Sequence, residues 1–230
     1  MSKIKFDCLT LFPEMFNALK ESIIGRAIEN ENIELNLINI RDFSKDKHKK
    51  VDDTPYGGGA GMVMKADVVY EAFKSIKQNE AEKPKVIYMS PQGKKLNQKK
   101  VEELSEEKHL IILCGHYEGV DQRVIDKIVD EEISIGDYVL TGGELPAMVL
   151  IDSVSRYAEG VIKKESIEEE SFTNGILEYP QFTRPEVFEG VKVPEVLLSG
   201  NHQNIDKWRK EEALKITKIK RPDLLKDLEN

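Results

Sequence analysis

Five short segments of this chain have residue types that could bind a nucleotide-like ligand and do chemistry on it. Four of them contain glycine and stand where strand-like apolar runs end: residues 55–62, 90–93, 114–123 and 134–146. The fifth, residues 152–156, ends an apolar helical pattern with Arg156. Glycine lets the backbone take positive φ angles and approach a ligand closely. Several such loops at one edge of an α/β sheet make a pocket of backbone N–H and C=O groups, so the segments predict a cofactor site.

The glycine run at 57–61 has the wrong spacing for two common phosphate-binding motifs. No Gly-Lys-Ser or Gly-Lys-Thr follows it, and Met62 stands where a dinucleotide-binding motif needs its last glycine. The sequence therefore gives little support for an ATP or nicotinamide cofactor. A phosphate-hydrolysing activity would have this glycine run as its only evidence. The run could instead be a flexible turn, or it could let a planar base or a phosphate approach the backbone.

Four carboxylates cluster in the glycine-rich segments: Glu118, Asp121, Asp137 and Glu144. A single acidic residue in a loop is usually solvated. Clustered near strand ends, these side chains favour a cationic ligand, a divalent ion or proton abstraction. Arg156 could favour the C-terminal end of its helix dipole, or its planar donors could contact an anion or a carbonyl oxygen.

Cysteine and histidine give no metal-binding pattern. Cys8 and Cys114 lie in apolar strand patterns and are predicted to be buried thiols. His48, His116 and His202 stand alone in polar loops, which disfavours metal ligation by them.

Strand and helix patterns alternate over residues 1–160, which predicts the α/β class. The expected strands are 4–12, 33–40, 85–89, 110–114 and 132–139, and the expected helices are 13–21, 65–78, 98–106, 121–129 and 145–157. Residues 33–40 alternate in polarity, as an edge strand does. Pro13 suits a first helical turn and Asp121 suits a helix cap.

The pattern changes after residue 160. Residues 161–176 are polar and acidic and are predicted to form a flexible linker. Residues 177–200 contain three prolines and are expected to be extended or irregular, and helices are expected at 205–219 and 222–228. Residues 177–230 are therefore predicted to form a small helical domain.

Charge and hydropathy exclude some classes and leave one question open. Of the 230 residues, 33% are charged and 40% are hydrophobic. No apolar run is long enough to cross a bilayer, and no signal peptide is visible. A cytoplasmic protein is therefore expected. The net charge of -8 argues against nucleic acid, but residues 207–222 hold seven basic and two acidic side chains, and residues 45–50 are also basic. These patches fit either RNA bound at a limited surface or solvated faces.

Taken together, the five segments resemble the bacterial tRNA (guanine-N1)-methyltransferases of the knotted SPOUT class. The similarity starts at residues 11–16, includes residues 51–53, and continues through residues 179–185 and 197–202. It implies a knotted, S-adenosyl-L-methionine-binding parallel-sheet domain at 1–160, a linker at 161–176 and a tRNA-binding helical domain at 177–230. It also implies a homodimer, a requirement for Mg2+, and methylation of N1 of the guanosine at position 37 of tRNA.

The resemblance assigns roles to individual residues. The cofactor would contact Tyr88, Ser90, Pro91, Gln92, Gly115, Tyr117, Glu118, Gly119, Ile135, Gly136, Asp137, Tyr138, Val139, Leu140, Gly142 and Gly143. The tRNA would contact Tyr56, Gly57, Gly58, Gly59, Ser171, Lys215, Lys218 and Lys220. Glu118 would lie near the methionine part of the cofactor, and Arg156 would orient guanine or stabilise charge on its O6.

The chain departs from the family at the general base. The family has an aspartate immediately before a Ser-Phe pair in the linker, whereas here Glu170 precedes Ser171, with Glu168 and Glu169 beside it. The linker is also one residue shorter. The catalytic carboxylate is therefore expected among these three residues, with Glu170 in the matching position.

Two rival hypotheses remain at this stage. One is a SPOUT methyltransferase that modifies a different RNA position. The other is a non-enzymatic RNA- or nucleotide-binding module on the same fold. The intact glycines at 115, 136, 142 and 143 count against the second.

Overall fold

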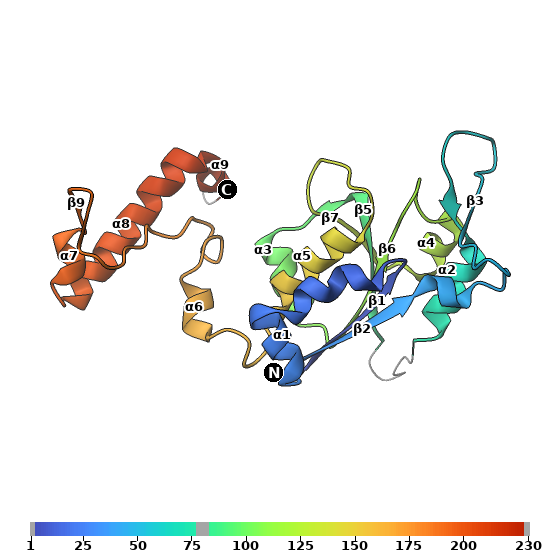
Figure 1. The fold of residues 1–230 in the computed structure, drawn as a ribbon. Coiled ribbons are helices and arrows are strands. Elements are labelled where there is room, and N and C mark those ends of the chain that lie inside the picture. Colours follow the sequence, from blue (N-terminus) through green and yellow to red (C-terminus); the bar gives the residue numbers. More distant parts are fainter. Residues whose placement is uncertain (1–2, 77–82, 228–230) are drawn as a thin grey trace. The chain divides into compact units, whose positions relative to one another are not determined.

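A computed structural model describes residues 3–76 and 83–227. The chain divides into two compact units, residues 1–162 and residues 163–230 (Figure 1). Among the described residues, no helix combines the length and the apolar character needed to cross a membrane.

The N-terminal unit is built on a five-stranded sheet. Its strands are β1 (Ile4–Thr10), β2 (Ile33–Asn39), β5 (Lys85–Lys95), β6 (His109–Cys114) and β7 (Glu131–Ser134), in the order β2-β1-β6-β5-β7. Every neighbouring pair is parallel. This confirms the predicted α/β class and the edge position of β2. The path of the chain through the predicted knot stays a prediction.

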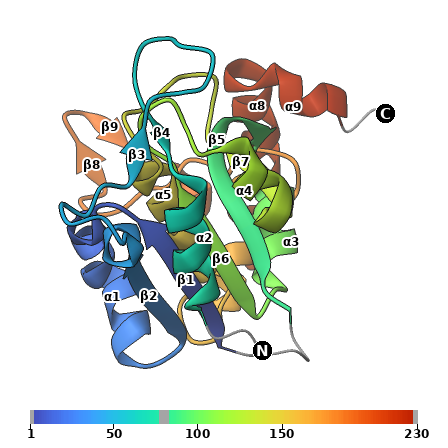
Figure 2. The same ribbon diagram turned by 90° about the vertical axis from the view of Figure 1, so that its right-hand side faces the viewer.

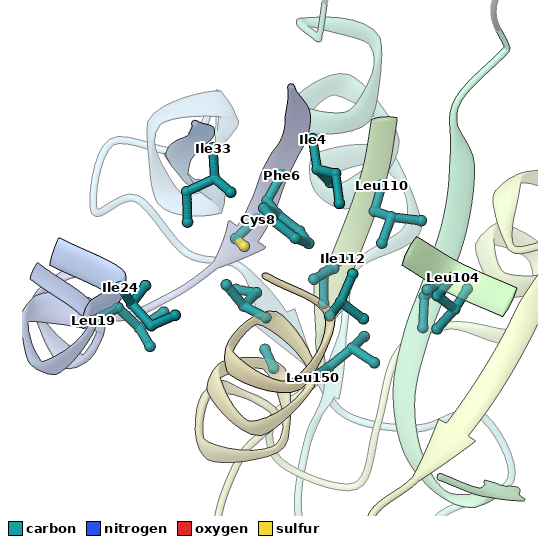
Figure 3. Packing of buried hydrophobic residues seen from close by; sticks show 14 of the residues in the cluster. Ile4, Phe6, Cys8, Leu19, Ile24, Ile33, Leu104, Leu110, Ile112 and Leu150 are labelled. Atoms are coloured by element: carbon teal, nitrogen blue, oxygen red, sulfur yellow. The ribbon is translucent and has the colours of Figure 1, made fainter. Parts of the chain in front are cut away.

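Helices cover both faces of this sheet (Figure 2). On one face, η1 (Pro13–Lys20), α1 (Ser22–Glu29), α3 (Gln98–Ser105) and α5 (Glu144–Ser155) pack on inward-facing strand residues such as Phe6, Cys8 and Ile112 (Figure 3). On the other face, α2 (Ala66–Lys74) and α4 (Gln122–Ile128) pack on Leu9 and Ile111. Successive strand residues face opposite layers, so strands covered on both faces read as continuous apolar runs.

Shorter elements connect these layers. The short helix η2 (Ile40–Phe43) follows β2, and β3 (Asp52–Asp53) and β4 (Val63–Met64) form a small antiparallel pair around the glycine run.

Cys8 and Cys114 are buried free thiols, as predicted, and burial raises the pKa of both. Asp121 caps α4 by accepting a hydrogen bond from the Arg123 backbone N–H, as predicted.

The structure corrects several predicted boundaries. The strand predicted at 132–139 ends at Ser134, because the Ser134 hydroxyl bonds both backbone groups of Gly136 and turns the chain. The strand predicted at 85–89 continues to Lys95, with a register shift between Met89 and Lys94. Helix α2 ends at Lys74, and the last two residues of the helix predicted at 65–78 lie outside the described residues.

Helix α1 was not predicted from the sequence. It begins at Ser22, which has a φ of 59°, immediately after η1. A Cβ atom at Gly25 would lie 2.0 Å from the Lys20 carbonyl oxygen, so only glycine allows this close helix-to-helix turn. The helix therefore depends on a backbone approach that apolar periodicity does not reveal.

The C-terminal unit is mainly helical. It contains α6 (Lys164–Glu168), β8 (Val187–Phe188), β9 (Val191–Lys192), α7 (Glu195–Leu198), α8 (His202–Lys220) and α9 (Pro222–Asp227). The helices predicted at 205–219 and 222–228 correspond to α8 and α9, and residue 228 lies outside the described residues. Helix α6 lies within the predicted linker, and a short hairpin and α7 interrupt the segment expected to be irregular.

Candidate active site

The ends of β5 and β6 and the loop after β7 enclose a cavity of about 320 Å³. This volume is at the small end of the range for cavities that bind small ligands. All of the predicted cofactor residues except Asp137 line it. Three segments that are separate in the sequence, 88–92, 115–125 and 132–146, therefore meet at the carboxyl edge of the parallel sheet, where α/β proteins bind their ligands. The identity of the ligand stays a prediction.

Glycine is required where the walls of this cavity touch one another. The Gly143 backbone N–H donates to the Gly115 carbonyl at 2.9 Å. A Cβ atom at Gly143 would lie 2.7 Å from the Cys114 Cα, and one at Gly115 would lie 2.7 Å from the Tyr88 hydroxyl oxygen. The loops after β6 and β7 therefore pack backbone to backbone. The backbone polar groups that do not bond between the loops remain available to bind a ligand.

Tyrosines contribute both the floor and the mouth of the cavity. Tyr88 is buried, and burial, followed by the nearby Glu132 charge, raises the pKa of its phenol. The phenol therefore stays protonated at neutral pH and remains a hydrogen-bond donor. Tyr117 and Tyr138 line the cavity but are about half exposed. Exposed rings at a cavity mouth suit a planar, aromatic ligand.

Of the four clustered carboxylates, only Glu118 lines this cavity. Asp137 was predicted to contact the cofactor, but it does not line the cavity, and its exposed side chain forms an ion pair with Lys95. Asp121 is engaged by the Arg123 guanidinium, whose hydrogen bond lowers the pKa of the carboxyl group. Glu144 is completely buried. The four acidic residues therefore do not gather at one site, although all of them stand near glycines in the sequence.

The glycine run between β3 and β4 has an open tip and contacts the cavity wall at its C-terminal end. Tyr56 is almost fully exposed, and Cβ atoms added at Gly57 and Gly58 would meet nothing within 4 Å. At the other end, the Glu118 backbone N–H donates to the Met62 carbonyl at 2.9 Å, and Gly61 packs against the Glu118 side chain. The loop is thus fastened to the cavity wall while its tip faces open space.

This arrangement predicts a difference between two glycine substitutions. Gly58 and Gly61 both have positive φ angles, of 81° and 83°, so alanine strains the backbone equally at both. Only at Gly61 would the new Cβ lie 2.2 Å from Glu118 Oε1. The Glu118 side chain is exposed, so it would move to make room and would leave its place in the cavity wall. We therefore expect Gly61→Ala to weaken binding of S-adenosylhomocysteine more than Gly58→Ala in a calorimetric titration, by about tenfold, the effect of one lost hydrogen bond to a charged group. Equal affinities would contradict the role of the Gly61–Glu118 contact.

Arg156 caps the C-terminal end of α5, and its backbone N–H donates to the Asp152 carbonyl at 3.3 Å. The residue is half-buried. Helix α5 is apolar and packed into the core, which gives the Arg156 cap a rigid support.

The predicted base lies in the C-terminal unit, beside a cavity of about 330 Å³ that Glu168, Glu169 and Glu170 line. Glu169 accepts a hydrogen bond from the Tyr179 hydroxyl at 2.8 Å and lies 3.6 Å from the Arg209 guanidinium. Partial burial, then this hydrogen bond, raises the pKa of Tyr179. Glu169 is thus held within its own unit.

The predicted tRNA contacts of this unit lie on α8 and in the turn after α6. The Ser171 hydroxyl accepts a hydrogen bond from the Glu178 backbone N–H at 3.0 Å. Lys215, Lys218 and Lys220 lie on the exposed surface of α8, and Lys215 pairs with Glu212 at 3.0 Å. Across the described part of the chain, no group of three or more His, Cys, Asp and Glu side chains could hold a metal ion.

The cavity also contains Met89 and His116, which lie within the ranges 88–92 and 115–119 expected to form the cofactor site. Residues outside the expected ranges line it too: Val120, Gln122, Ile125, Glu132, Ile133, Ser134, Thr141 and Pro146. The most informative is His116, which the sequence suggested was isolated. Its Nε2 atom lies 2.6 Å from Glu144 Oε2. One signal was available, because Glu144 opens an apolar, buried helix and a carboxylate there needs a partner.

Comparison with known proteins defines the class. Residues 4–227 match the family described as tRNA (Guanine-1)-methyltransferase TrmD. A tRNA (guanine-N(1)-)-methyltransferase of Ruminiclostridium cellulolyticum is 63% identical over 229 residues, covering 99% of this chain and 98% of that protein. Proteins of the same name from Clostridioides difficile and Endomicrobium trichonymphae are 57% and 58% identical over 97% of this chain and over 98% and 100% of their own lengths.

The fold and the matched length together define a methyltransferase with a parallel-sheet domain. The chain belongs to the bacterial tRNA (guanine-N1)-methyltransferase family, which confirms the resemblance seen in the sequence.

Proposed function

We propose that this protein transfers a methyl group from S-adenosyl-L-methionine to N1 of the guanosine at position 37 of tRNA. The observation that supports this most strongly is the cavity at the sheet edge, which gathers almost all of the expected cofactor residues in a member of this family. A tRNA substrate of this kind is modified in the cytoplasm, where we expect the protein to act.

The residues present fit the cofactor. Backbone groups of the loops after β6 and β7 would read the adenine, and the glycines at 115 and 143 leave no space for side chains between these walls. Glu118 places a carboxylate in a cavity that would receive a cationic sulfonium ligand. When bound, the cofactor supplies a methyl group that is already activated on sulfur. The task of the protein is then to align the acceptor with it.

The acceptor requires a base, because N1 of neutral guanine carries a proton. We propose that Glu170 removes this proton. Glu170 is preferred to Glu169 because it stands immediately before Ser171, where the family resemblance places the base. As the proton leaves, negative charge develops toward O6, and the planar donors of Arg156 would stabilise it. Mg2+ remains an expectation from the family resemblance.

The basic surface of α8 would supply tRNA affinity. Contacts between lysine and phosphate release counterions, so they make binding strongly dependent on salt. Reversing the charge of Lys215, Lys218 and Lys220 should weaken tRNA binding and flatten its dependence on salt concentration. Titrations of tRNA at several salt concentrations would measure this, and cofactor affinity should not change. An unaltered salt dependence would count against an RNA-binding role for α8.

We also propose that the active form is a homodimer whose active site uses residues from both chains. A linker base and a cofactor-binding domain must act on the same guanine, and the family resemblance implies that two copies provide them. Light scattering at the assay concentration should show a dimer. A fully active monomer would contradict this part of the proposal.

The proposed position can be mapped directly. After incubation with the protein and S-adenosyl-L-methionine, tRNA should stop reverse transcription at position 37, because an N1-methyl group blocks the pairing edge of guanine. A stop elsewhere would favour a methyltransferase with a different RNA target. Binding of tRNA without any stop, and without affinity for S-adenosylhomocysteine, would favour a non-enzymatic module.

A further inference from the structure

Glu144 is a completely buried carboxylate that the proposed chemistry does not use. It lies in the first turn of α5, and both of its oxygens have partners. Oε1 accepts a hydrogen bond from the Thr10 hydroxyl at 2.6 Å, and Oε2 lies 2.6 Å from His116 Nε2. A buried charge is costly unless it is paired and hydrogen-bonded. Loss of either partner would therefore be unfavourable, and this keeps the three side chains together.

The three partners come from three different elements. Thr10 ends β1, His116 follows β6, and Glu144 begins α5. The His116 ring lies edge-on to the Phe12 ring, with centroids 4.9 Å apart. The buried carboxylate therefore fastens the loop after β6 to the end of β1 and to the helix that follows the loop after β7.

The backbone confirms how closely these two loops are joined. His116 forms an isolated β-bridge with Gly142. A Cβ atom at Gly142 would lie 2.2 Å from His116 Cε1 and 2.8 Å from Glu144 Oε2. Glycine at this position thus makes room for the His116–Glu144 pair, in the same wall of the cavity that contains Gly115 and Gly143.

We propose that Thr10, His116 and Glu144 form a positioning unit that sets the separation of the two glycine loops and thereby controls cofactor affinity. Glu144 does not itself line the cavity, so it acts through His116 and the backbone. This inference rests on the proposed function, since it assumes that the cavity binds S-adenosyl-L-methionine. The alternative is that the buried pair stabilises the fold and has no specific influence on the cavity.

The N-terminal unit contains a matched pair for separating these alternatives. Asp7 is also buried, and its Oδ2 atom lies 2.7 Å from His109 Nε2. Burial alone would raise the pKa of Asp7, but hydrogen bonds from His109 and Asn36 and the charge of Lys5 hold it below its ordinary value. Neither Asp7 nor His109 lines the cavity. Asp7→Asn therefore disturbs a similar buried pair in the same unit at a place unrelated to the ligand.

The test compares Glu144→Gln with Asp7→Asn in the full-length protein. Urea unfolding gives the stability of each variant, and calorimetric titration with S-adenosylhomocysteine, at a temperature where every variant is folded, gives the affinity. We expect Glu144→Gln to raise the Kd about tenfold, as for loss of one partner of a buried hydrogen-bonded pair. Asp7→Asn should change stability but leave the Kd within about twofold of the wild-type value, a difference too small to reflect a lost hydrogen bond.

A second set of variants addresses His116. Gln places an amide nitrogen near the position of His Nε2, so His116→Gln should bind more tightly than His116→Ala. If the pair acts as a unit, the double variant Glu144→Gln/His116→Ala should bind no more weakly than His116→Ala alone. Should Glu144→Gln fail to fold, Thr10→Val takes its place in the comparison. It removes the hydroxyl that donates to Glu144 and accepts from the Phe12 backbone N–H.

The outcomes separate the inference from the function on which it rests. A wild-type protein that does not bind S-adenosylhomocysteine would overturn the proposed function. Wild-type binding with unchanged affinity in Glu144→Gln and His116→Ala would overturn the positioning role alone. An equal loss of affinity in Asp7→Asn would also overturn it, because the effect would then follow from any buried pair in the unit.

Discussion

Replacing Glu170 with glutamine should lower the single-turnover rate of methyl transfer by roughly 10²–10⁴-fold, the usual contribution of a general base. Glutamine keeps the shape of the side chain but cannot accept the N1 proton of guanine. S-adenosylhomocysteine should bind with unchanged affinity, because the glycine loops that line the proposed cofactor cavity belong to the other unit. Rapid quenching with excess enzyme over labelled tRNA would measure the rate.

The matched control for this prediction is Glu169→Gln. Glu169 adjoins Glu170 and lines the same cavity, but it does not occupy the position immediately before Ser171 where the family resemblance places the base. Its substitution should therefore leave the rate largely intact. Glu170→Asp restores the residue type of the family and should retain substantial activity. Near-normal transfer by Glu170→Gln would remove Glu170 from the mechanism and direct attention to Glu168.

Arg156→Ala should lower the single-turnover rate by about 10²–10³-fold, the effect of removing one donor that stabilises developing negative charge. Arg156→Lys should recover only part of this loss, because an ammonium group lacks the planar donors that match an oxygen and its neighbours. The affinity for S-adenosylhomocysteine should not change in either variant.

Arg26→Ala provides the control for this experiment. Arg26 is an exposed arginine on α1 in the same unit, with its Nε atom 3.4 Å from the Ser22 carbonyl. Its removal should leave the rate unchanged. A similar rate for Arg156→Ala and Arg26→Ala would show that Arg156 has no part in the chemistry.

Most of the sheet could be predicted because its strands carry a strong local signal. Strands β1 and β6 and the first half of β5 are mainly apolar and buried, and β2 alternates because it lies at the edge of the sheet. The elements that were missed depend on contacts distant from their own pattern. The end of β7 depends on the Ser134–Gly136 turn, and α1 depends on the approach of Gly25 to Lys20. A knot depends on the path of the whole chain, which no local pattern can reveal.

The candidate site, too, could be predicted only in part from the sequence. Glycine loops could be predicted to meet because the carboxyl ends of parallel strands share one edge of the sheet. The partners of individual side chains could not. Glu144 is paired with Thr10, 134 residues away, and with His116, 28 residues away. Asp137 forms an ion pair with Lys95 and does not line the cavity. Such pairings arise from packing between elements, whereas the sequence shows only that charged residues stand near glycine.

The most direct test of the proposed function is methyl transfer from labelled S-adenosyl-L-methionine to two tRNA transcripts that differ only at position 37. The transcript with guanosine at that position should incorporate label, and digestion should recover it as N1-methylguanosine. The transcript with adenosine should remain unlabelled. Equal labelling of both transcripts, or no labelling of either by a protein that binds S-adenosylhomocysteine, would contradict the proposed function.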